Sequence, residues 1–269
     1  MQIINANLRS SDRTLATRLE RAEAANGLEL ARLAVEAVPG VAFESIAGGT
    51  AIFAGVGSAM THALGVGLSG QVSEEEMERL EAFYRKRGSP CLLDLCPMAD
   101  DSVINFVQSR PYRVIEFNNV LARAVQPEEI FDSSSSLRLA MPDEKRQWSH
   151  VVSQGFAEYV PVTESQIDLM VAICRDVQCW FAETDEPVGG AAMAVQDHAA
   201  LFFGDAILTG ARRKGWQSLL IRERLAAAQK AGCDLAMASV LPGSASHRNY
   251  ERAGFQLIYM RINLLREFT

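Results

Sequence analysis

The 269-residue sequence contains no uncharged apolar run of the roughly eighteen residues that a membrane-spanning helix needs. Its N-terminus, with Arg9, Asp12 and Arg13, also lacks the apolar core of a signal peptide. Basic residues are in the minority, 26 against 33 acidic ones, and the formal net charge of -7 disfavours a nucleic-acid or anionic-membrane partner. We therefore expect a globular cytoplasmic protein that binds neither nucleic acid nor membrane.

Cysteine and histidine are scarce, with five and four residues respectively. The odd number of cysteines, and their position inside apolar runs, favours buried thiols over a disulfide framework. Two pairs, Cys91 with Cys96 and Cys174 with Cys179, share a four-residue gap, but zinc sites usually pair cysteines at shorter spacing. The sequence thus predicts free thiols and no metal ion.

The two halves of the chain resemble each other at an offset of about 144 residues. An apolar run begins at Leu235 as one does at Cys91, and Tyr250 occupies the place of Phe106. Solenoid repeats have periods of only about 20 to 50 residues, so this offset indicates a duplicated domain.

Residues 126–136, with one proline and four consecutive serines, have the composition of a linker. We place the boundary near residue 132, which gives domains of residues 1–131 and 132–269.

The C-terminal half alternates helical and strand patterns. Helices are predicted after Pro142 and from Thr163, which forms a capping box with Gln166. Short turns between the first three strands imply antiparallel hairpins, so we expect a mixed α/β domain with a mostly antiparallel sheet. The remaining predicted elements are strands 177–183, 188–195 and 199–208, helix 215–231, strand 235–241, helix 245–252 and strand 255–264.

The turn between strand 199–208 and the following helix is rich in positive charge. Arg212, Arg213 and Lys214 stand between Gly210 and Gly215. Free N–H groups and the helix dipole make a helix N-terminus suitable for an anion, and glycine lets the backbone approach phosphate oxygens closely. The segment predicts a diphosphate site, although a basic surface loop before an ordinary helix would look the same.

The motifs ARRKGWQSLLI and NYERAGF resemble the signature of the GNAT superfamily of N-acyltransferases. In that family an R/Q-x-x-G-x-G/A turn binds the pyrophosphate of coenzyme A, and a tyrosine near a Gly-Phe pair lies beside the CoA sulfur. Arg212 and Gly215 match the turn, and Tyr250 matches the tyrosine before Gly254 and Phe255. The resemblance implies acetyl-CoA as co-substrate and a fold of two tandem GNAT-like domains, each a mostly antiparallel sheet flanked by helices.

The sequence departs from the family at Gln217, where Gly or Ala is usual, so this side chain must point away from the phosphates. Gly243 also stands where many members have Asn. The backbone N–H of Ile207 or Leu208 is expected to polarise the thioester carbonyl. The full set of predicted cofactor-binding residues is Ile207, Leu208, Arg212, Arg213, Lys214, Gly215, Trp216, Gln217, Ser218 and Asn249.

The implied reaction is the direct transfer of an acetyl group from acetyl-CoA to a primary amine of a small molecule or peptide. The amine must lose a proton, since its pKa is near 10.4, and the thiolate must gain one. Tyr250 is the candidate general acid, with a core packing role as the alternative. Asp205 is the candidate base, and Glu183 and His247 remain open.

The N-terminal half lacks the matching chemistry. Its turn is followed by Glu74, Glu75 and Glu76, which repel a diphosphate, and Phe106 has no hydroxyl. We expect a degenerate GNAT-like domain there, unless it binds the acceptor. For the whole chain the alternative function is a CoA-binding sensor or structural pseudoenzyme, and the sequence leaves the acceptor and the oligomeric state open.

Overall fold

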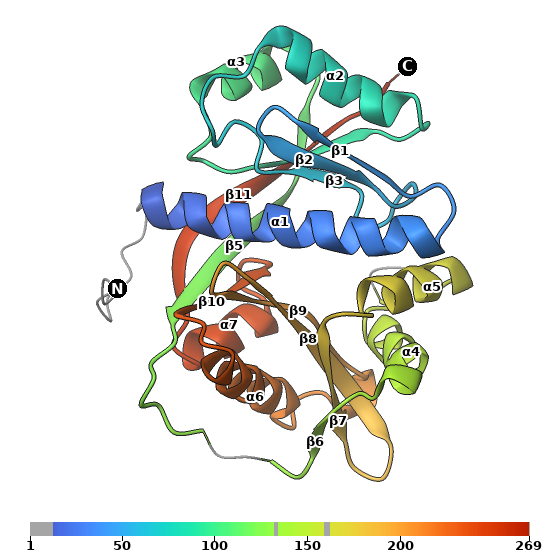
Figure 1. The fold of residues 1–269 in the computed structure, drawn as a ribbon, viewed down its shortest axis with the longest axis vertical. Coiled ribbons are helices and arrows are strands. Elements are labelled where there is room, and N and C mark those ends of the chain that lie inside the picture. The colour runs from blue at the N-terminus through green and yellow to red at the C-terminus, as the bar shows by residue number, and fades with distance from the viewer. Residues whose placement is uncertain (1–12, 132–133, 159–161, 269) are drawn as a thin grey trace. The chain divides into compact units, whose positions relative to one another are not determined.

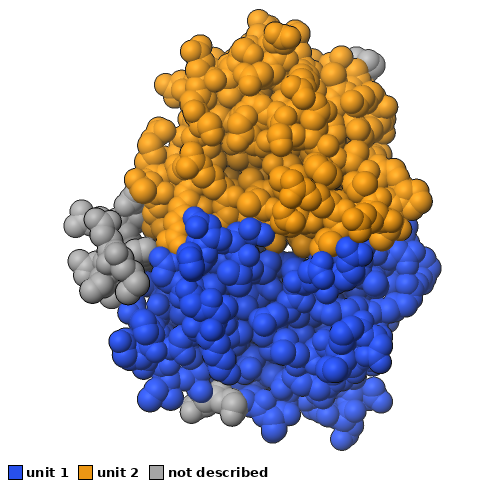
Figure 2. Space-filling view, viewed as in Figure 1, with its two compact units in different colours: residues 1–9, 121–257 blue, residues 10–120, 258–269 orange. Residues whose placement is uncertain are grey.

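The computed structural model describes residues 13–131, 134–158 and 162–268. Of these, residues 121–257 form one compact unit (unit 1, blue in Figure 2), and residues 13–120 with 258–268 form the other (unit 2, orange). The architecture is mixed α/β, with a large, mostly antiparallel sheet and flanking helices, as the sequence predicts.

Unit 2 contains most of the N-terminal half (Figure 1). Its strand order is β1-β2-β3-β4-β11, where β11 spans Gln256–Arg266, and among these strands only β3 and β4 pair in parallel. The core includes Met77, Leu80 and Phe83 from α2 and Leu93 from β4. In chain order its elements are α1 (Arg13–Ala37), β1 (Ala42–Ile46), β2 (Gly49–Phe53), β3 (His62–Leu64), α2 (Glu74–Arg85), β4 (Cys91–Leu95) and α3 (Asp101–Ser109).

Unit 1 contains most of the C-terminal half, and its strand order is β5-β10-β9-β8-β7-β6. Neighbours from β6 to β9 pair antiparallel, whereas β9 and β10 pair in parallel. From residue 113 onward the elements of the chain, of which β5 and β11 are shared between the units, are β5 (Arg113–Ala124), β6 (Leu137–Leu139), η1 (Pro142–Glu144), α4 (Lys145–Gly155), α5 (Glu164–Ile173), β7 (Gln178–Glu183), β8 (Pro187–Gln196), β9 (Ala199–Ile207), η2 (Thr209–Ala211), α6 (Trp216–Lys230), β10 (Leu235–Val240), α7 (Ala245–Arg252) and β11 (Gln256–Arg266).

Local sequence signals account for most element ends in unit 1. The predicted capping box is present: the Thr163 hydroxyl accepts from the Gln166 N–H at 3.3 Å, and the Thr163 N–H donates to the Gln166 side chain at 3.2 Å. Gly232 follows α6 with a φ of +73°, as a helix-ending glycine does. The helices and strands predicted for residues 145–264 are confirmed to within a few residues, but the short strand β6 was not predicted.

Two long strands pass from one unit to the other. Residues 113–120 of β5 belong to unit 2 and residues 121–124 to unit 1. Strand β11 begins in unit 1, and from Ile258 it lies in unit 2, where Ile262 pairs with Leu95 of β4. The last strand of the C-terminal half therefore completes the sheet that the N-terminal half builds.

The predicted domain boundary, near residue 132, lies outside the described residues. The division into domains 1–131 and 132–269 follows the sequence duplication and stays a prediction. The compact units differ from it because β5 and β11 cross between them.

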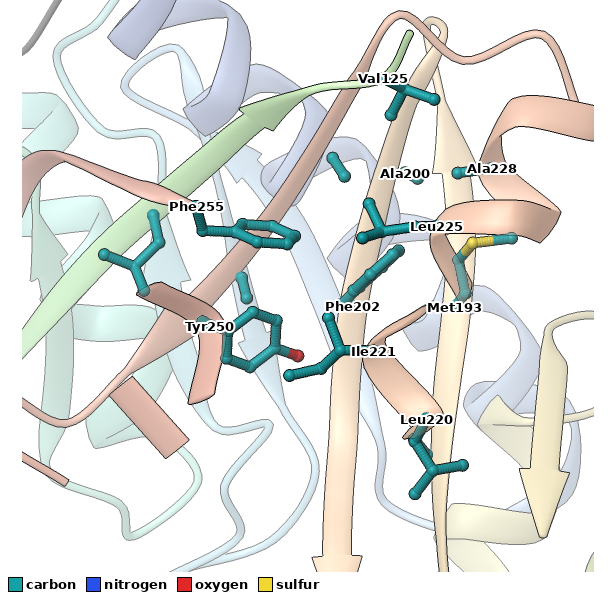
Figure 3. Packing of buried hydrophobic residues seen from close by; sticks show 14 of the residues in the cluster. Val125, Met193, Ala200, Phe202, Leu220, Ile221, Leu225, Ala228, Tyr250 and Phe255 are labelled. Carbon is teal, nitrogen blue, oxygen red and sulfur yellow. The ribbon is translucent and has the colours of Figure 1, made fainter. Parts of the chain in front are cut away.

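The core of unit 1 lies between its sheet and helices α6 and α7 (Figure 3). Ile221 and Leu225 of α6 meet Phe202 of β9, with Tyr250 and Phe255 closing the cluster on the other side. All five cysteines are buried and unbridged, which confirms the predicted thiols. None of the described helices is long and apolar enough to span a bilayer.

Candidate functional site

A bulge in β9 marks the region ahead of the cationic turn. Gly190 pairs with Ala206 and Ala192 with Phe203, so Gly204 and Asp205 together oppose one residue of β8. Gly204 has a φ of +66°, the left-handed conformation that such a bulge needs. The bulge re-aims the strand, and Asp205 lies at this point.

Strand β9 pairs with its parallel neighbour β10 over only its first few residues. The β9–β10 ladder covers Ala199–Phe202 against Leu235–Ala238, whereas β9 itself continues to Ile207 and β10 to Val240. The bulged part of β9 thus lies outside the ladder.

The N-terminus of α6 is open. Gly215 is its N-cap, with a left-handed φ of +87°, and no side chain caps the first turn. A Cβ atom added at Gly215 would meet nothing within 4 Å. Among the described residues, no side chain accepts a hydrogen bond from the first amide N–H groups of α6, so this helix start can receive an anion.

The three cations of the turn have different positions. Arg212 folds back: it donates to the Ile207 carbonyl at 3.1 Å and the Gly155 carbonyl at 3.0 Å, and pairs with Glu158 at 2.8 Å. Its side chain ties the turn to the end of α4. Arg213 and Lys214 are exposed, and neither side chain has a partner among the described residues.

Gln217 and Asn249 join α6 to α7. The Gln217 side chain donates to the Ser246 hydroxyl at 2.8 Å and accepts from the Asn249 amide at 2.7 Å. The Gln217 side chain therefore points towards α7, and Asn249 is held by this contact and by Arg252. Trp216 and Ser218 are half-buried at the start of the helix.

The two backbone positions predicted to polarise the thioester carbonyl are not equivalent. The Leu208 N–H donates to the Val188 carbonyl at 2.9 Å, so it is already engaged. Ile207 pairs with Gly189 at the end of β9, and its carbonyl accepts from Arg212.

The two predicted catalytic residues, Asp205 and Tyr250, lie in direct contact. The Tyr250 hydroxyl donates to Asp205 Oδ2 at 2.8 Å. Arg224 of α6 binds both carboxylate oxygens of Asp205, with Nη1 at 3.0 Å from Oδ2 and Nη2 on Oδ1, and its Nη2 lies 3.3 Å from the Tyr250 oxygen. Sequence reasoning missed Arg224, which is fully buried.

The surroundings of Arg224 fix its guanidinium group. It also donates to the carbonyls of Leu220 and Ala192, each at 3.1 Å, and its Cζ lies 4.5 Å from the centre of the Phe202 ring. Burial lowers the pKa of Arg224, but the charge of Asp205 and the contact with Tyr250 outweigh burial and raise it. The group stays charged and cannot turn away.

Tyr250 is held in its protonated form. Burial raises the pKa of its phenol well above the ordinary value, the Asp205 charge adds to this, and Arg224 opposes it. Its ring packs edge-on against Phe255, with 4.9 Å between ring centres. The other base candidates have different partners: Glu183 pairs with Arg138, and His247 lies 3.6 Å from Glu251.

The matching helix start in unit 2 is closed by its own side chains. The Ser73 hydroxyl accepts from the Glu76 N–H at 3.2 Å, and Glu76 accepts from the Ser73 N–H at 2.9 Å. A Cβ atom on Gly70, which is the counterpart of Gly215 in the repeat, would meet nothing within 4 Å, so it is the Ser73 and Glu76 side chains that close this helix start. Unlike α6, α2 begins without an open first turn.

Within the described residues, no group of three His, Cys, Asp or Glu side chains is arranged to hold a metal ion.

Comparison with known proteins gives a result only at the level of structure, because no family model and no curated protein matches the sequence. A GCN5-related N-acetyltransferase from Kribbella flavida superposes with a TM-score of 0.67 over 95% of this chain and 96% of its own, at 14% identity. This likeness shows that the chain has a GNAT fold.

Two further solved structures agree. A tandem GNAT protein from the clavulanic acid biosynthesis pathway, solved without acetyl-CoA, covers 96% of both chains with a TM-score of 0.56 and 13% identity. A GCN5-related N-acetyltransferase from Sphaerobacter thermophilus covers 66% of this chain and 60% of its own, with a TM-score of 0.54 and 16% identity. In this tandem GNAT fold, the bulged β9 and the start of α6 belong to unit 1.

Proposed function

We propose that this protein is a cytoplasmic, metal-independent N-acetyltransferase that transfers the acetyl group of acetyl-CoA to a primary amine of a small molecule or peptide. The observation that carries the proposal is the uncapped, left-handed start of α6 at Gly215, directly after the bulged β9 of a tandem GNAT fold. An anion-binding helix start at this place in this fold suits the diphosphate of coenzyme A.

The residues of the turn fit a diphosphate in two ways. The N–H groups of Trp216, Gln217 and Ser218 head the helix without a side-chain cap, and Arg213 and Lys214 supply positive charge beside them. Arg212 has a different part in this proposal, since its guanidinium group holds the turn against Gly155 and Glu158. Acetyl-CoA supplies the thioester whose carbonyl carbon the amine attacks.

Tyr250 is the proposed general acid, because its phenol keeps its proton at neutral pH. Asp205 accepts that hydroxyl proton in a hydrogen bond, and both of its oxygens are bound by Arg224. This geometry favours a role for Asp205 in aligning Tyr250. Its role as base stays a hypothesis, together with Glu183 and His247.

Calorimetry with acetyl-CoA tests the cofactor site. The double variant Arg213→Glu, Lys214→Glu should weaken binding by at least about tenfold, because two attractive charges beside the phosphates become repulsive. The control is Arg222→Glu, an exposed position on the same helix, which should leave affinity within about twofold. No heat with the wild-type protein, or equal affinity in the double variant, would contradict the proposal.

One observation favours the second candidate, a CoA-binding sensor or pseudoenzyme. The Tyr250 side chain is 1% exposed, and its hydroxyl is already bonded to Asp205 and Arg224. Amine-dependent release of CoA from acetyl-CoA, followed with a thiol reagent across a panel of amines, amino acids and peptides, separates the two. Binding without turnover on any amine would favour the sensor.

A further inference from the structure

Arg224 is a charged residue on the apolar face of α6. It lies between Leu220, Ile221, Leu225 and Ala228, all of which are in the core, and its own side chain is fully buried. A buried guanidinium group is tolerated only when it is paired and hydrogen-bonded. Arg224 meets this requirement through Asp205, Tyr250 and two backbone carbonyls.

The carboxylate of Asp205 makes it harder for Tyr250 to act as an acid. The carboxylate lies 2.8 Å from the phenol oxygen, and a second negative charge at that distance would oppose formation of a phenolate. The positive charge of Arg224 stands beside both groups, with Nη2 on Asp205 Oδ1 and 3.3 Å from the Tyr250 oxygen. It is therefore placed to offset the charge that would develop on Tyr250.

Resting on the proposed acetyl transfer, we infer that Arg224 is a positioning residue that enables Tyr250 to give up its proton. When the amine nitrogen bonds to the thioester carbonyl carbon, the C–S bond breaks and its electron pair stays on sulfur. The Tyr250 proton moves to that sulfur and forms the thiol. The phenolate then accepts a hydrogen bond from Arg224 Nη2, and the proton lost by the new amide nitrogen passes to water or back to Tyr250.

Arg224 can stabilise the phenolate of Tyr250 without moving. Its Nε and Nη1 are fixed by the Leu220 and Ala192 carbonyls, so Nη2 already points at the phenol oxygen in the resting protein. A donor fixed in advance stabilises a developing charge better than one that must reorient.

A double-mutant cycle tests the inference, with Arg224→Lys, Tyr250→Phe and the two combined. Lysine keeps the positive charge but lacks the second guanidinium nitrogen, so it cannot bind Asp205 and Tyr250 at the same time as arginine does. Arg224→Lys should lower kcat by at least about tenfold while the acetyl-CoA dissociation constant changes less than about threefold. In the Tyr250→Phe background the same change should cost less than about twofold, because Arg224 acts through the phenol.

Arg222→Lys is the matched control, since Arg222 is exposed on the same helix and should leave kcat unchanged. Melting temperatures of each variant report folding. Additive losses of kcat in the cycle would show a merely structural role for Arg224 and would overturn the inference.

A second measurement needs no acceptor amine. The thiolate absorbance of bound CoA, titrated with pH, gives the pKa of its thiol, which a phenol donor lowers. That pKa should rise in Tyr250→Phe and in Arg224→Lys, and no further in the double variant. Absence of CoA binding would instead overturn the proposed function, whereas CoA binding with an unchanged thiol pKa in Arg224→Lys would overturn only the inference.

Discussion

Each compact unit contains a buried arginine that is paired with carboxylates. In unit 1, Arg224 binds Asp205. In unit 2, Arg261 of β11 binds Glu20 of α1, with 2.8 Å between Nη2 and Oε1. The side chains of Arg224 and Arg261 are 0% and 2% exposed. Removing one partner from such a pair typically costs about 3 to 5 kcal/mol, because the other charge stays buried and unpaired. These pairs therefore bind specific strands and helices together within each unit.

The contact between the partly buried His62 and the buried Asp94 makes the stability of the protein depend on pH. In unit 2, His62 Nδ1 lies 3.0 Å from Asp94 Oδ2. Burial pulls the pKa of His62 down, but the charge and hydrogen bond of Asp94 outweigh burial and raise it above 6.5. The stabilisation that His62 adds to the free energy of unfolding is thus complete below its unfolded pKa of about 6.5. It is lost as the pH rises through the higher pKa of the folded protein.

His62→Gln should consequently lower the melting temperature more at pH 5.5 than at pH 8.5, as measured by circular dichroism. His150→Gln on α4 is the control, since its ring has no ion-pair partner among the described residues. A larger loss at the higher pH in His62→Gln would reverse the expected sign and contradict the assignment.

At the scale of the element, the equivalent helices of the two units, α2 and α6, begin in different ways. Helix α2 has a capping box from Ser73 and Glu76, with Glu74 and Glu75 in its first turn. Helix α6 has a left-handed glycine and no cap. A capped start such as that of α2 favours stability, whereas an uncapped start such as that of α6 favours anion binding. The difference between residues 73–76 and 212–215 therefore distinguishes a structural helix from a candidate binding helix.

Helix α5 offers a direct measure of what a cap contributes. Thr163→Ala removes the side-chain acceptor for the Gln166 N–H and should destabilise the protein by about 1 kcal/mol. Chemical denaturation measures the free energy of unfolding, and Thr163→Ser, which keeps the hydroxyl, should be close to the wild type. Equal stability of the Ala and Ser variants would show that the box contributes nothing.

At the scale of the whole molecule, the exchange of strands decides which pieces of the chain can fold. Unit 1 needs Leu121 and Val125 in its core, and these precede the linker. Residues 258–266 of β11 lie in the C-terminal half of the sequence but belong to unit 2, where residues 262–266 pair with β4. Neither half of the sequence therefore contains a complete unit.

A fragment of residues 132–269 should for this reason fail to fold stably, although it contains the whole candidate cofactor site. The full chain cut by a protease within residues 126–136 should stay folded, because every strand is still present. Size-exclusion chromatography and circular dichroism compare the two. A fragment as stable as the cut full chain would show that the exchanged strands are dispensable.

The sequence determined what depends on neighbours along the chain. The repeat offset, the strand and helix order of residues 145–264, the Thr163 capping box and the glycine-flanked cations all follow from periodicity, caps and turn composition. Arg224 had a weaker signal, a charge on the apolar stripe of a predicted helix, which implies a buried partner without naming it.

Only the tertiary structure decided which distant groups meet. The two halves have equivalent last strands, so their patterns cannot specify which sheet each one joins, and the structure assigns residues 258–266 to unit 2. The same holds for Arg212, which folds back onto Gly155, and for Asp205, Arg224 and Tyr250, which come from three separate elements. Contacts of this kind depend on how whole elements pack, and that information is spread over the chain instead of being contained in any one segment.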